Sequence, residues 1–265
     1  MKEVLLRALT GSVFIAVIVG AIYVRWGGAP LVFAVFAGAL TWEFVGLDSH
    51  RSSRVWRVMQ ALASGYLFTG VYGVVQYGWS EAVLAPYVFF LLYVAASELF
   101  RGSPDPLGSM SQTVFGQLYC GGSLSLLSFF EEGDQVLSVF VLVWVNDTVA
   151  YLTGSSLGRH AFFPSVSPKK SWEGFVGGAV GAVLAGQVLC GLLEVGLSPL
   201  GWLGLSVSVV LSSTAGDLLE SLLKRRFCVK DSGHALPGHG GFLDRFDSVL
   251  FAIPASYIYF QLMVW

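Results

Sequence analysis

Long apolar stretches, separated by short polar connections, run along almost the whole chain. A membrane-spanning helix needs about 20 mainly apolar residues. Segments that approach this length are found at roughly 8–24, 29–47, 58–77, 82–99, 109–130, 135–153, 174–196, 199–223 and 248–265. The pattern predicts an all-α polytopic transmembrane bundle of about nine spans, in which residues 1–265 form a single integral membrane domain.

The weakest of these segments is 109–130. It carries Ser111, Gln112 and Gln117 together with several glycines and serines. Polar side chains in a membrane helix need partners on neighbouring helices. We therefore expect this segment to be buried among other helices if it crosses the membrane.

The basic residues predict the orientation of the spans. With the N-terminus in the cytoplasm, every basic residue of the 15 except Arg25 falls at the cytoplasmic side, while the acidic stretch 131–134 falls outside. Cytoplasmic loops are enriched in Lys and Arg, so the C-terminus is predicted to lie outside. The two longest inner connections, about 154–173 and 224–247, are rich in Gly, Pro, Ser, Lys and His, as functional loops often are.

Composition excludes several classes of protein. Hydrophobic residues make up 55% of the chain and charged residues 12%, with a mean hydropathy of +0.70. Soluble domains carry about 25% charged residues, so an ordinary soluble enzyme and a disordered chain are both excluded. No basic arm suggests a nucleic-acid partner. The three cysteines form no CxxC pair, so we expect neither disulfides nor structural zinc.

Glu43, Asp147, Asp217 and Glu220 lie within the apolar segments, where a charge costs roughly 2.5–3.5 kcal/mol to insert. Asp217 could belong to a functional site or form an internal ion pair that only joins helices, and its position favours the functional site. Glu220 lies four residues before Lys224, a spacing that favours an ion pair between the two within one helix. Asp147 either helps to bind a cation or nucleotide or satisfies a neighbouring helix end. Glu43 lies near its helix end, which favours snorkelling to the interface.

Residues 221–247 combine five cations with Asp231, Asp244 and Asp247. Carboxylates and cations side by side suit a phosphate-rich substrate with Mg²⁺, and the segment Pro237–Gly241 could bring backbone N–H groups close to a phosphate. Each feature also has a structural explanation when it is taken alone. The cations could anchor the membrane topology, the glycines could form a tight turn, and Asp247 could be the N-cap of the last span. Their combination within one segment favours a substrate-binding site.

The same segment resembles the signature of the phosphatidate cytidylyltransferase (CDP-diacylglycerol synthase) family. The matching positions are Ser221, Lys224, Arg225, Lys230, Asp231, Gly233, Leu236, Pro237, His239, Gly240, Gly241, Asp244, Arg245 and Asp247. The similarity extends to Asp147, Tyr151, Gly154, the stretch 167–174, Gly216 and Asp217. It covers roughly 144–247, whereas the first hundred residues match only as generic spans.

The resemblance implies that CTP and phosphatidate give CDP-diacylglycerol and pyrophosphate in a homodimer of the inner membrane, with the active site facing the cytoplasm and membrane lipids around it. Mg²⁺ would be held by Asp217 and Asp244, with K⁺ as a candidate second cation. Residues 1–110 would be N-terminal spans and 111–265 catalytic spans. The catalytic residues expected are Asp217, Asp244, Lys224, Lys230 and Asp231. The substrate-binding residues expected are Lys169, Lys170, Ser171, Asp147, Ser221, Arg225, His239, Gly240, Gly241, Arg245 and Asp247.

Several interpretations remain open at this point. Lys169, Lys170 and Ser171 could contact CTP phosphates or the lipid head group, or form a basic interfacial anchor, and they are not part of a P-loop. His239 could contact phosphate or be structural. The glycines at 174, 177, 178 and 181 favour close helix packing over dimerisation. Alternative functions are a CTP-dependent lipid kinase, a CDP-ether-lipid synthase and an ion-coupled transporter.

Overall fold

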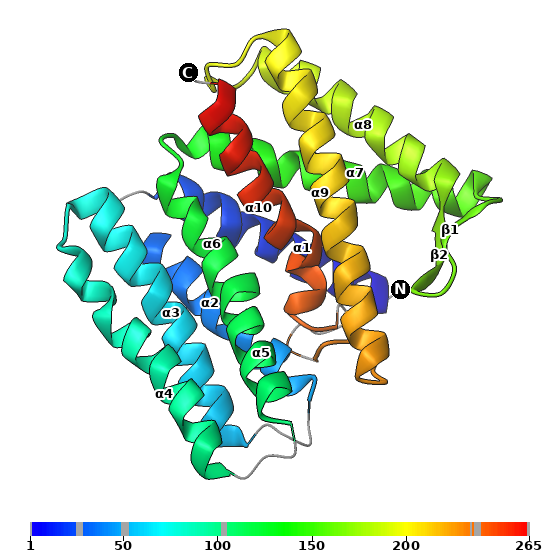
Figure 1. Ribbon diagram of the computed structural model, residues 1–265. Helices are drawn as coiled ribbons and strands as arrows, with labels where there is room; N and C mark the ends of the chain where they lie inside the picture. Colours follow the sequence, from blue (N-terminus) through cyan, green and yellow to red (C-terminus); the bar gives the residue numbers. More distant parts are fainter. Residues whose placement is uncertain are drawn as a thin grey trace. The chain divides into compact units, whose positions relative to one another are not determined.

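The chain folds into two compact units. The computed structural model describes residues 2–24, 29–48, 53–101, 105–233, 235 and 240–263. The first unit comprises Met1–Phe129 and Asp231–Asp244, and the second comprises Phe130–Lys230 and Arg245–Trp265. Figure 1 shows the order of the elements, from α1 in blue to α10 in red.

The described part of the first unit is mainly helical. Its elements are α1 (Lys2–Tyr23), α2 (Ala29–Gly46), α3 (Arg54–Tyr77), the 3-10 helix η1 (Glu81–Leu84), α4 (Ala85–Arg101), α5 (Pro106–Gly116), the π-helix η2 (Gln117–Gly122), α6 (Ser123–Ser125) and the 3-10 helix η3 (Leu126–Phe129). Helices α2 and α3 pack closely because each offers a glycine to the other. A Cβ on Gly38 would lie 3.0 Å from the Ala61 carbonyl oxygen, and one on Gly65 would lie 3.0 Å from that of Ala34.

The weakest predicted span forms the interrupted helix from α5 to η3. Its Gln117 side chain is fully buried and accepts a hydrogen bond from Ser64 Oγ at 2.9 Å. The Gln117 amide also donates to Gln60 Oε1 at 2.7 Å. The expected burial is confirmed at Thr113 and Gln117, whereas Ser111 is exposed. Hydrogen bonds to α3 thus compensate for the polar side chains in this segment.

The second unit contains long helices and one short hairpin. Its elements are α7 (Gly133–Leu157), β1 (Ala161–Phe163), β2 (Ser167–Ser171), α8 (Trp172–Cys190), α9 (Pro199–Arg226) and all but the first residues of α10 (Leu243–Met263). Strands β1 and β2 are antiparallel, with Ala161 opposite Ser171 and Phe163 opposite Ser167. The helical class is as predicted, but the hairpin was not expected from the sequence.

Close packing between α7 and α8 depends on the glycines of α8. A Cβ on Gly174 would lie 2.9 Å from the Ala150 carbonyl oxygen, and one on Gly178 would lie 2.7 Å from Asn146 Oδ1. Either distance is too short for a larger residue, so the prediction that these glycines serve helix packing is confirmed. Figure 1 shows the two helices side by side, with the hairpin at one end of the pair.

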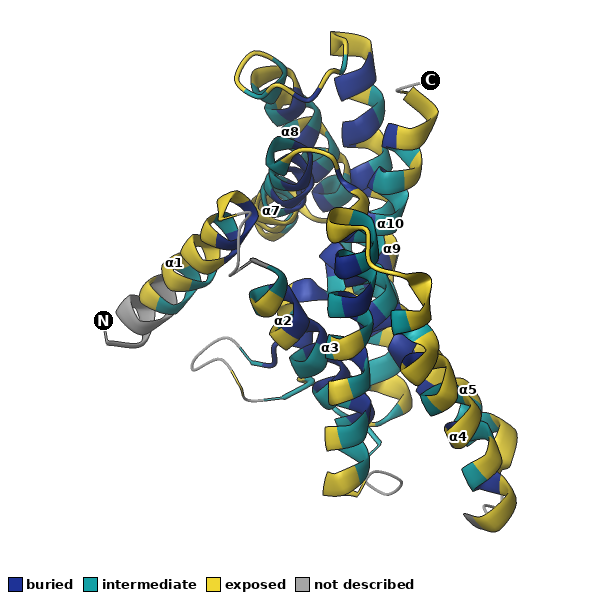
Figure 2. Ribbon diagram, turned by 90° about the vertical axis from the view of Figure 1, so that its left-hand side faces the viewer, coloured by how far each residue is buried: buried dark blue, intermediate teal, exposed yellow. Residues whose placement is uncertain are grey.

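Membrane-spanning character follows from helix length and apolarity. Within the described residues, six helices are long and apolar enough to cross a membrane: Arg54–Tyr77, Glu81–Phe100, Gly133–Leu157, Trp172–Cys190, Pro199–Arg226 and Leu243–Met263. Leu9–Tyr23 and Pro30–Gly46 are shorter apolar helices. The apolar side chains of Phe89 and Leu92 on α4 are exposed, as expected of a surface that faces lipid. Figure 2 marks the exposed stretches of this helix in yellow. The count of nine spans and their orientation stay predictions.

Candidate active site

An aromatic cluster holds the hairpin against the start of α8. The Phe162 ring meets that of Trp172 edge-on, with 4.5 Å between centroids, and stacks on that of Phe175 at 5.1 Å. Ser171 ends β2 and caps α8 by accepting a hydrogen bond from the Gly174 N–H at 3.1 Å. Lys169 and Lys170, which are predicted to bind substrate, therefore lie on a strand whose end is fixed to a helix.

The hairpin brings one of these two lysines to helix α9. Lys170 Nζ forms an ion pair with Asp217 Oδ2. The side chains are 26% and 31% exposed, so the pair remains accessible to a substrate. Lys169, by contrast, is exposed. The structure thus distinguishes two adjacent lysines that the sequence treated alike.

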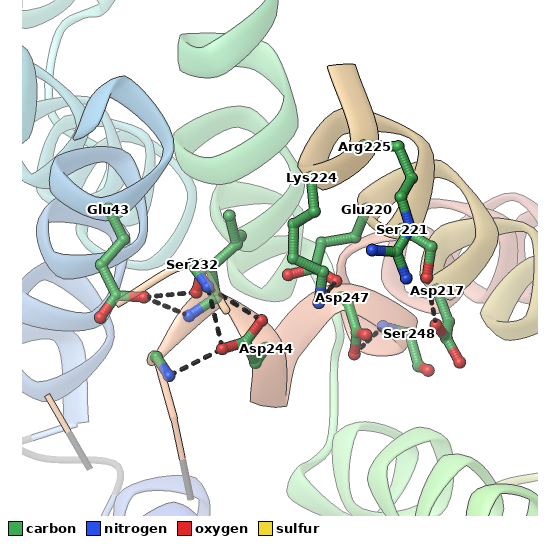
Figure 3. A network of polar contacts seen from close by, with 12 residues as sticks. Glu43, Asp217, Glu220, Ser221, Lys224, Arg225, Ser232, Asp244, Asp247 and Ser248 are labelled. Atoms are coloured by element: carbon green, nitrogen blue, oxygen red, sulfur yellow. Dashed lines mark hydrogen bonds and ion pairs between the residues drawn. The ribbon is translucent and has the colours of Figure 1, made fainter. Parts of the chain in front are cut away.

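Asp217 lies where helices α9 and α10 approach closely. A Cβ on the preceding residue, Gly216, would overlap the carbonyl oxygen of Asp247. The glycine therefore lets the two helices meet at this level. Asp217 Oδ1 also accepts a hydrogen bond of 3.4 Å from the Ser221 hydroxyl one turn later (Figure 3).

Two further carboxylates from the second unit belong to the same cluster. Asp147 on α7 and Asp247 on α10 each lie near enough to Asp217 to interact with it electrostatically. Asp147 also accepts a hydrogen bond from the Ser248 side chain. Asp147 is exposed, and Asp217 and Asp247 are partly exposed. Three helices thus contribute acids to one open cluster, which we call the acidic cluster.

Asn146 explains part of the polar patch around Asp147. Its side chain is buried and its amide donates to Ser213 Oγ on α9 at 3.3 Å and to Asp147 Oδ1 at the same distance. Asn146 and Asp147 thus have different surroundings, although they are neighbours in the sequence. Asn146 joins the helices, whereas Asp147 belongs to the acidic cluster.

The C-terminal turn of α9 supplies cations. Lys224 Nζ pairs with Glu220 at 2.5 Å, four residues earlier, and Glu220 is fully buried, so the predicted pair is confirmed. Arg225 is exposed and its Nε donates to the Val166 carbonyl of the hairpin at 3.5 Å. This second link between α9 and the hairpin places another cation beside the lysine-bearing strand.

Asp244 belongs to the first unit, in the first turn of α10. Its Oδ2 accepts a hydrogen bond from the Gly241 N–H at 2.7 Å, and the Ser232 N–H donates to both carboxylate oxygens at 3.1 and 3.2 Å (Figure 3). Gly240 has a φ of 83°, a left-handed conformation that glycine adopts without strain. Because α10 begins at Leu243, Asp247 is not its N-cap.

Glu43 is a residue whose role the sequence did not reveal. It is only 7% exposed, so the prediction that it snorkels to the interface is wrong. Its Oε2 accepts hydrogen bonds from the Ser232 hydroxyl at 2.9 Å and the Leu243 N–H at 2.8 Å. Its partners lie about 190 and 200 residues later in the sequence. The only sign of its role in the sequence is the presence of an acid within an apolar helix.

The remaining predicted residues fall into two groups. Lys230, Asp231 and Arg245 are exposed. His239 lies outside the described residues. The residues that the structure does bring together are therefore those of the acidic cluster with Lys170 in the second unit, and those around Asp244 in the first.

A comparison of the chain with known protein families agrees with the motifs described above. A model described as the cytidylyltransferase family matches residues 5–263. The chain belongs to the cytidylyltransferase family. The match extends through the N-terminal helices, which on motifs alone had resembled only generic spans.

Similar members of the cytidylyltransferase family come from staphylococci. The chain is 46% identical over 121 residues to the phosphatidate cytidylyltransferase of Staphylococcus haemolyticus (strain JCSC1435), across 45% of this chain and 46% of that protein. It is 45% identical over 136 residues to the protein of the same name from Staphylococcus saprophyticus subsp. saprophyticus, across 50% and 52% of the two chains. For the Staphylococcus aureus (strain COL) protein of that name, the identity is 44% over 137 residues, across 49% and 52%. The chain thus spans about half the length of the relatives it matches.

A Mg²⁺ ion suits the acids of this cytidylyltransferase family member. Carboxylate oxygens are its preferred protein ligands, and it is usually bound through one or two of them together with substrate phosphates. Among the described residues, no group of three or more His, Cys, Asp and Glu could hold a metal ion. The partly exposed Asp217 carboxylate fits the mode in which the substrate completes the coordination.

Proposed function

We propose that the chain transfers CMP from CTP to phosphatidate, giving CDP-diacylglycerol and pyrophosphate. Membership of the cytidylyltransferase family and similarity to staphylococcal proteins named phosphatidate cytidylyltransferase support this function. The protein would work in the inner membrane, with its N-terminus and active site on the cytoplasmic side, its C-terminus outside and about nine spans. The proposed functional form is a homodimer.

The observation that carries the proposal is the ion pair between Lys170 and Asp217. It joins the lysine-bearing hairpin to the Gly-Asp pair of α9, two motifs that the sequence separates by more than forty residues. A cation beside an acidic cluster suits a reaction between two phosphate-bearing substrates.

The proposed reaction needs no activated Ser, Cys or His nucleophile. A phosphate oxygen of phosphatidate is already ionised at neutral pH and attacks the α-phosphorus of CTP. A new P–O bond forms there, while the bond from the α-phosphorus to the bridging oxygen breaks and pyrophosphate leaves with its electron pair. Such transfers depend mainly on positioning and on electrostatic stabilisation of charge.

The chain's own residues would overcome the repulsion between the two anionic substrates. Lys170 and Arg225, on elements that contact each other, would neutralise phosphate oxygens. Lys224 would add a cation from the last turn of α9. When bound, Mg²⁺ would supply positive charge that offsets the negative charge of the phosphate groups. We assign its protein ligands to Asp217 and Asp244, with K⁺ as a candidate second cation.

Purified protein in detergent should convert CTP and phosphatidate into CDP-diacylglycerol and pyrophosphate. EDTA should stop the reaction and excess Mg²⁺ should restore it, because the metal carries part of the charge stabilisation. The measurement is separation of the labelled lipid product together with pyrophosphate release. A CTP-dependent lipid kinase would instead transfer the γ-phosphoryl group of CTP to a lipid alcohol, giving a phosphorylated lipid and CDP. Turnover that is insensitive to chelation would contradict the metal's role.

Lys170→Ala should raise the apparent KM for CTP or phosphatidate by roughly 10- to 100-fold, because a charge-assisted hydrogen bond contributes about 1.5–3 kcal/mol. Lys169→Ala is the matched control, since Lys169 lies next in the chain but is exposed, and it should change KM much less. Steady-state kinetics with each substrate varied in turn would measure both. Equal effects of the two variants would favour a basic interfacial anchor over a substrate contact.

A further inference from the structure

We propose that Glu43 is a positioning residue that holds together the two ends of the segment 231–244 and thereby sets the position of Asp244. Glu43 lies on α2, far from this segment in sequence but in the same unit. The structural part of the proposal stands by itself. Its consequence for catalysis rests on the function proposed above, because Asp244 is there a metal ligand.

The contacts of the Glu43 carboxylate support this role. One of its oxygens, Oε2, accepts hydrogen bonds from both ends of the segment, from the Ser232 hydroxyl at 2.9 Å and from the Leu243 N–H at 2.8 Å (Figure 3). Glu43 is 7% exposed, and a buried carboxylate is costly unless it is hydrogen-bonded. Burial therefore favours the arrangement in which both donors stay in place.

Two glycines make room for the carboxylate. A Cβ on Gly233 would lie 2.6 Å from Glu43 Oε1, and a Cβ on Gly241 would lie 2.6 Å from Oε2. Any larger residue at either position would displace the acid or the backbone. The signature glycines at these positions thus have a physical reason here, which is the close approach of both ends of the segment to Glu43.

Ser232 connects Glu43 to Asp244. Its hydroxyl donates to Glu43, and its N–H donates to the Asp244 carboxylate at 3.1 and 3.2 Å. Glu43 also accepts from the N–H of Leu243, the residue before Asp244 and the first of α10. A negative charge is favourable at a helix N-terminus, so a glutamate serves this position better than a neutral residue.

The structural test is amide hydrogen exchange of the full-length protein in detergent without added metal. Glu43→Ala removes the oxygen that accepts both hydrogen bonds and should accelerate exchange in peptides containing Ser232 and Leu243 by about tenfold or more. Glu43→Gln and Ser232→Ala, each a milder change, should give smaller increases. If Glu43→Ala fails to fold, these two variants decide the question.

The matched control is Glu98→Gln. Glu98 is also a buried acid of the first unit, 5% exposed, and it accepts a hydrogen bond from a serine hydroxyl, that of Ser109 at 2.9 Å. This variant should leave exchange at Ser232 and Leu243 unchanged. Unchanged exchange in every folded Glu43 variant, or an equal increase in Glu98→Gln, would overturn the proposal.

The kinetic test separates positioning from general loss of stability. Glu43→Gln should raise the Mg²⁺ concentration needed for half-maximal CMP transfer by roughly 10-fold or more, with the KM for CTP changed less. Ser232→Ala should change it in the same direction, and the double variant should fall short of the product of the single effects, because both residues act through one link. Full additivity, or a Mg²⁺ requirement like that of the wild type, would contradict action through Ser232.

If the wild-type protein lacks the transferase activity, the proposed function fails, while the exchange experiment still tests the role of Glu43.

Discussion

Asp217→Asn should reduce the rate of CMP transfer by roughly 100- to 1,000-fold, the scale seen when one preorganised electrostatic group is removed from an active site. The amide keeps the size of the side chain but loses the charge that pairs with Lys170 and attracts a metal. Because Asp217 is partly exposed, we expect the variant to fold. Initial rates with CTP and phosphatidate at saturating Mg²⁺ would measure the loss.

Asp134→Asn provides the control for this variant. Asp134 is also an acid of the second unit and accepts a hydrogen bond from the Glu194 N–H at 3.2 Å, but it lies in the first turn of α7, at the end of that helix far from Asp147. Its substitution should leave the transfer rate within about twofold, as expected of a position outside the chemistry. A near-normal rate for Asp217→Asn would remove that residue from the site, whatever the control shows.

The positions of the helices could be predicted from hydrophobicity alone. A helical element lies at each of the predicted apolar segments, because burying apolar side chains and pairing the backbone in lipid both favour a helix. The ends differ by several residues where charged residues extend a helix into a connection. Helix α9 continues to Arg226, and α10 begins at Leu243 rather than near 248.

The hairpin could not be predicted in the same way. The segment 161–171 shows no clear alternation of apolar and polar residues, and its strands depend on tertiary contacts of Phe162 with the rings of Trp172 and Phe175. The choice between Lys169 and Lys170 follows from this strand, because neighbouring residues of a strand point to opposite sides. The order of residues in the motif alone does not distinguish Lys169 from Lys170.

Long-range partners account for the other differences. The sequence showed Asp147, Asp217 and Asp247 as separate acids, and only the packing of α7, α9 and α10 brings them into the acidic cluster. Glu43 was misread because its partners, Ser232 and Leu243, lie near the other end of the chain. Local sequence reports the cost of burying an acid, but it does not identify the donors that offset that cost.

Asp244→Asn should lower the transfer rate by roughly 100-fold or more and should also accelerate amide exchange at Ser232 and Gly241. Both effects are expected because the carboxylate is a proposed metal ligand and accepts hydrogen bonds from these two backbone N–H groups. Asp105→Asn is the control, since Asp105 likewise accepts a backbone N–H, that of Gly108, at the start of a helix of the same unit. Kinetics over a Mg²⁺ series and hydrogen exchange would separate the two roles. Faster exchange with normal turnover and an unchanged Mg²⁺ requirement would mean that Asp244 organises the backbone and does not bind the metal.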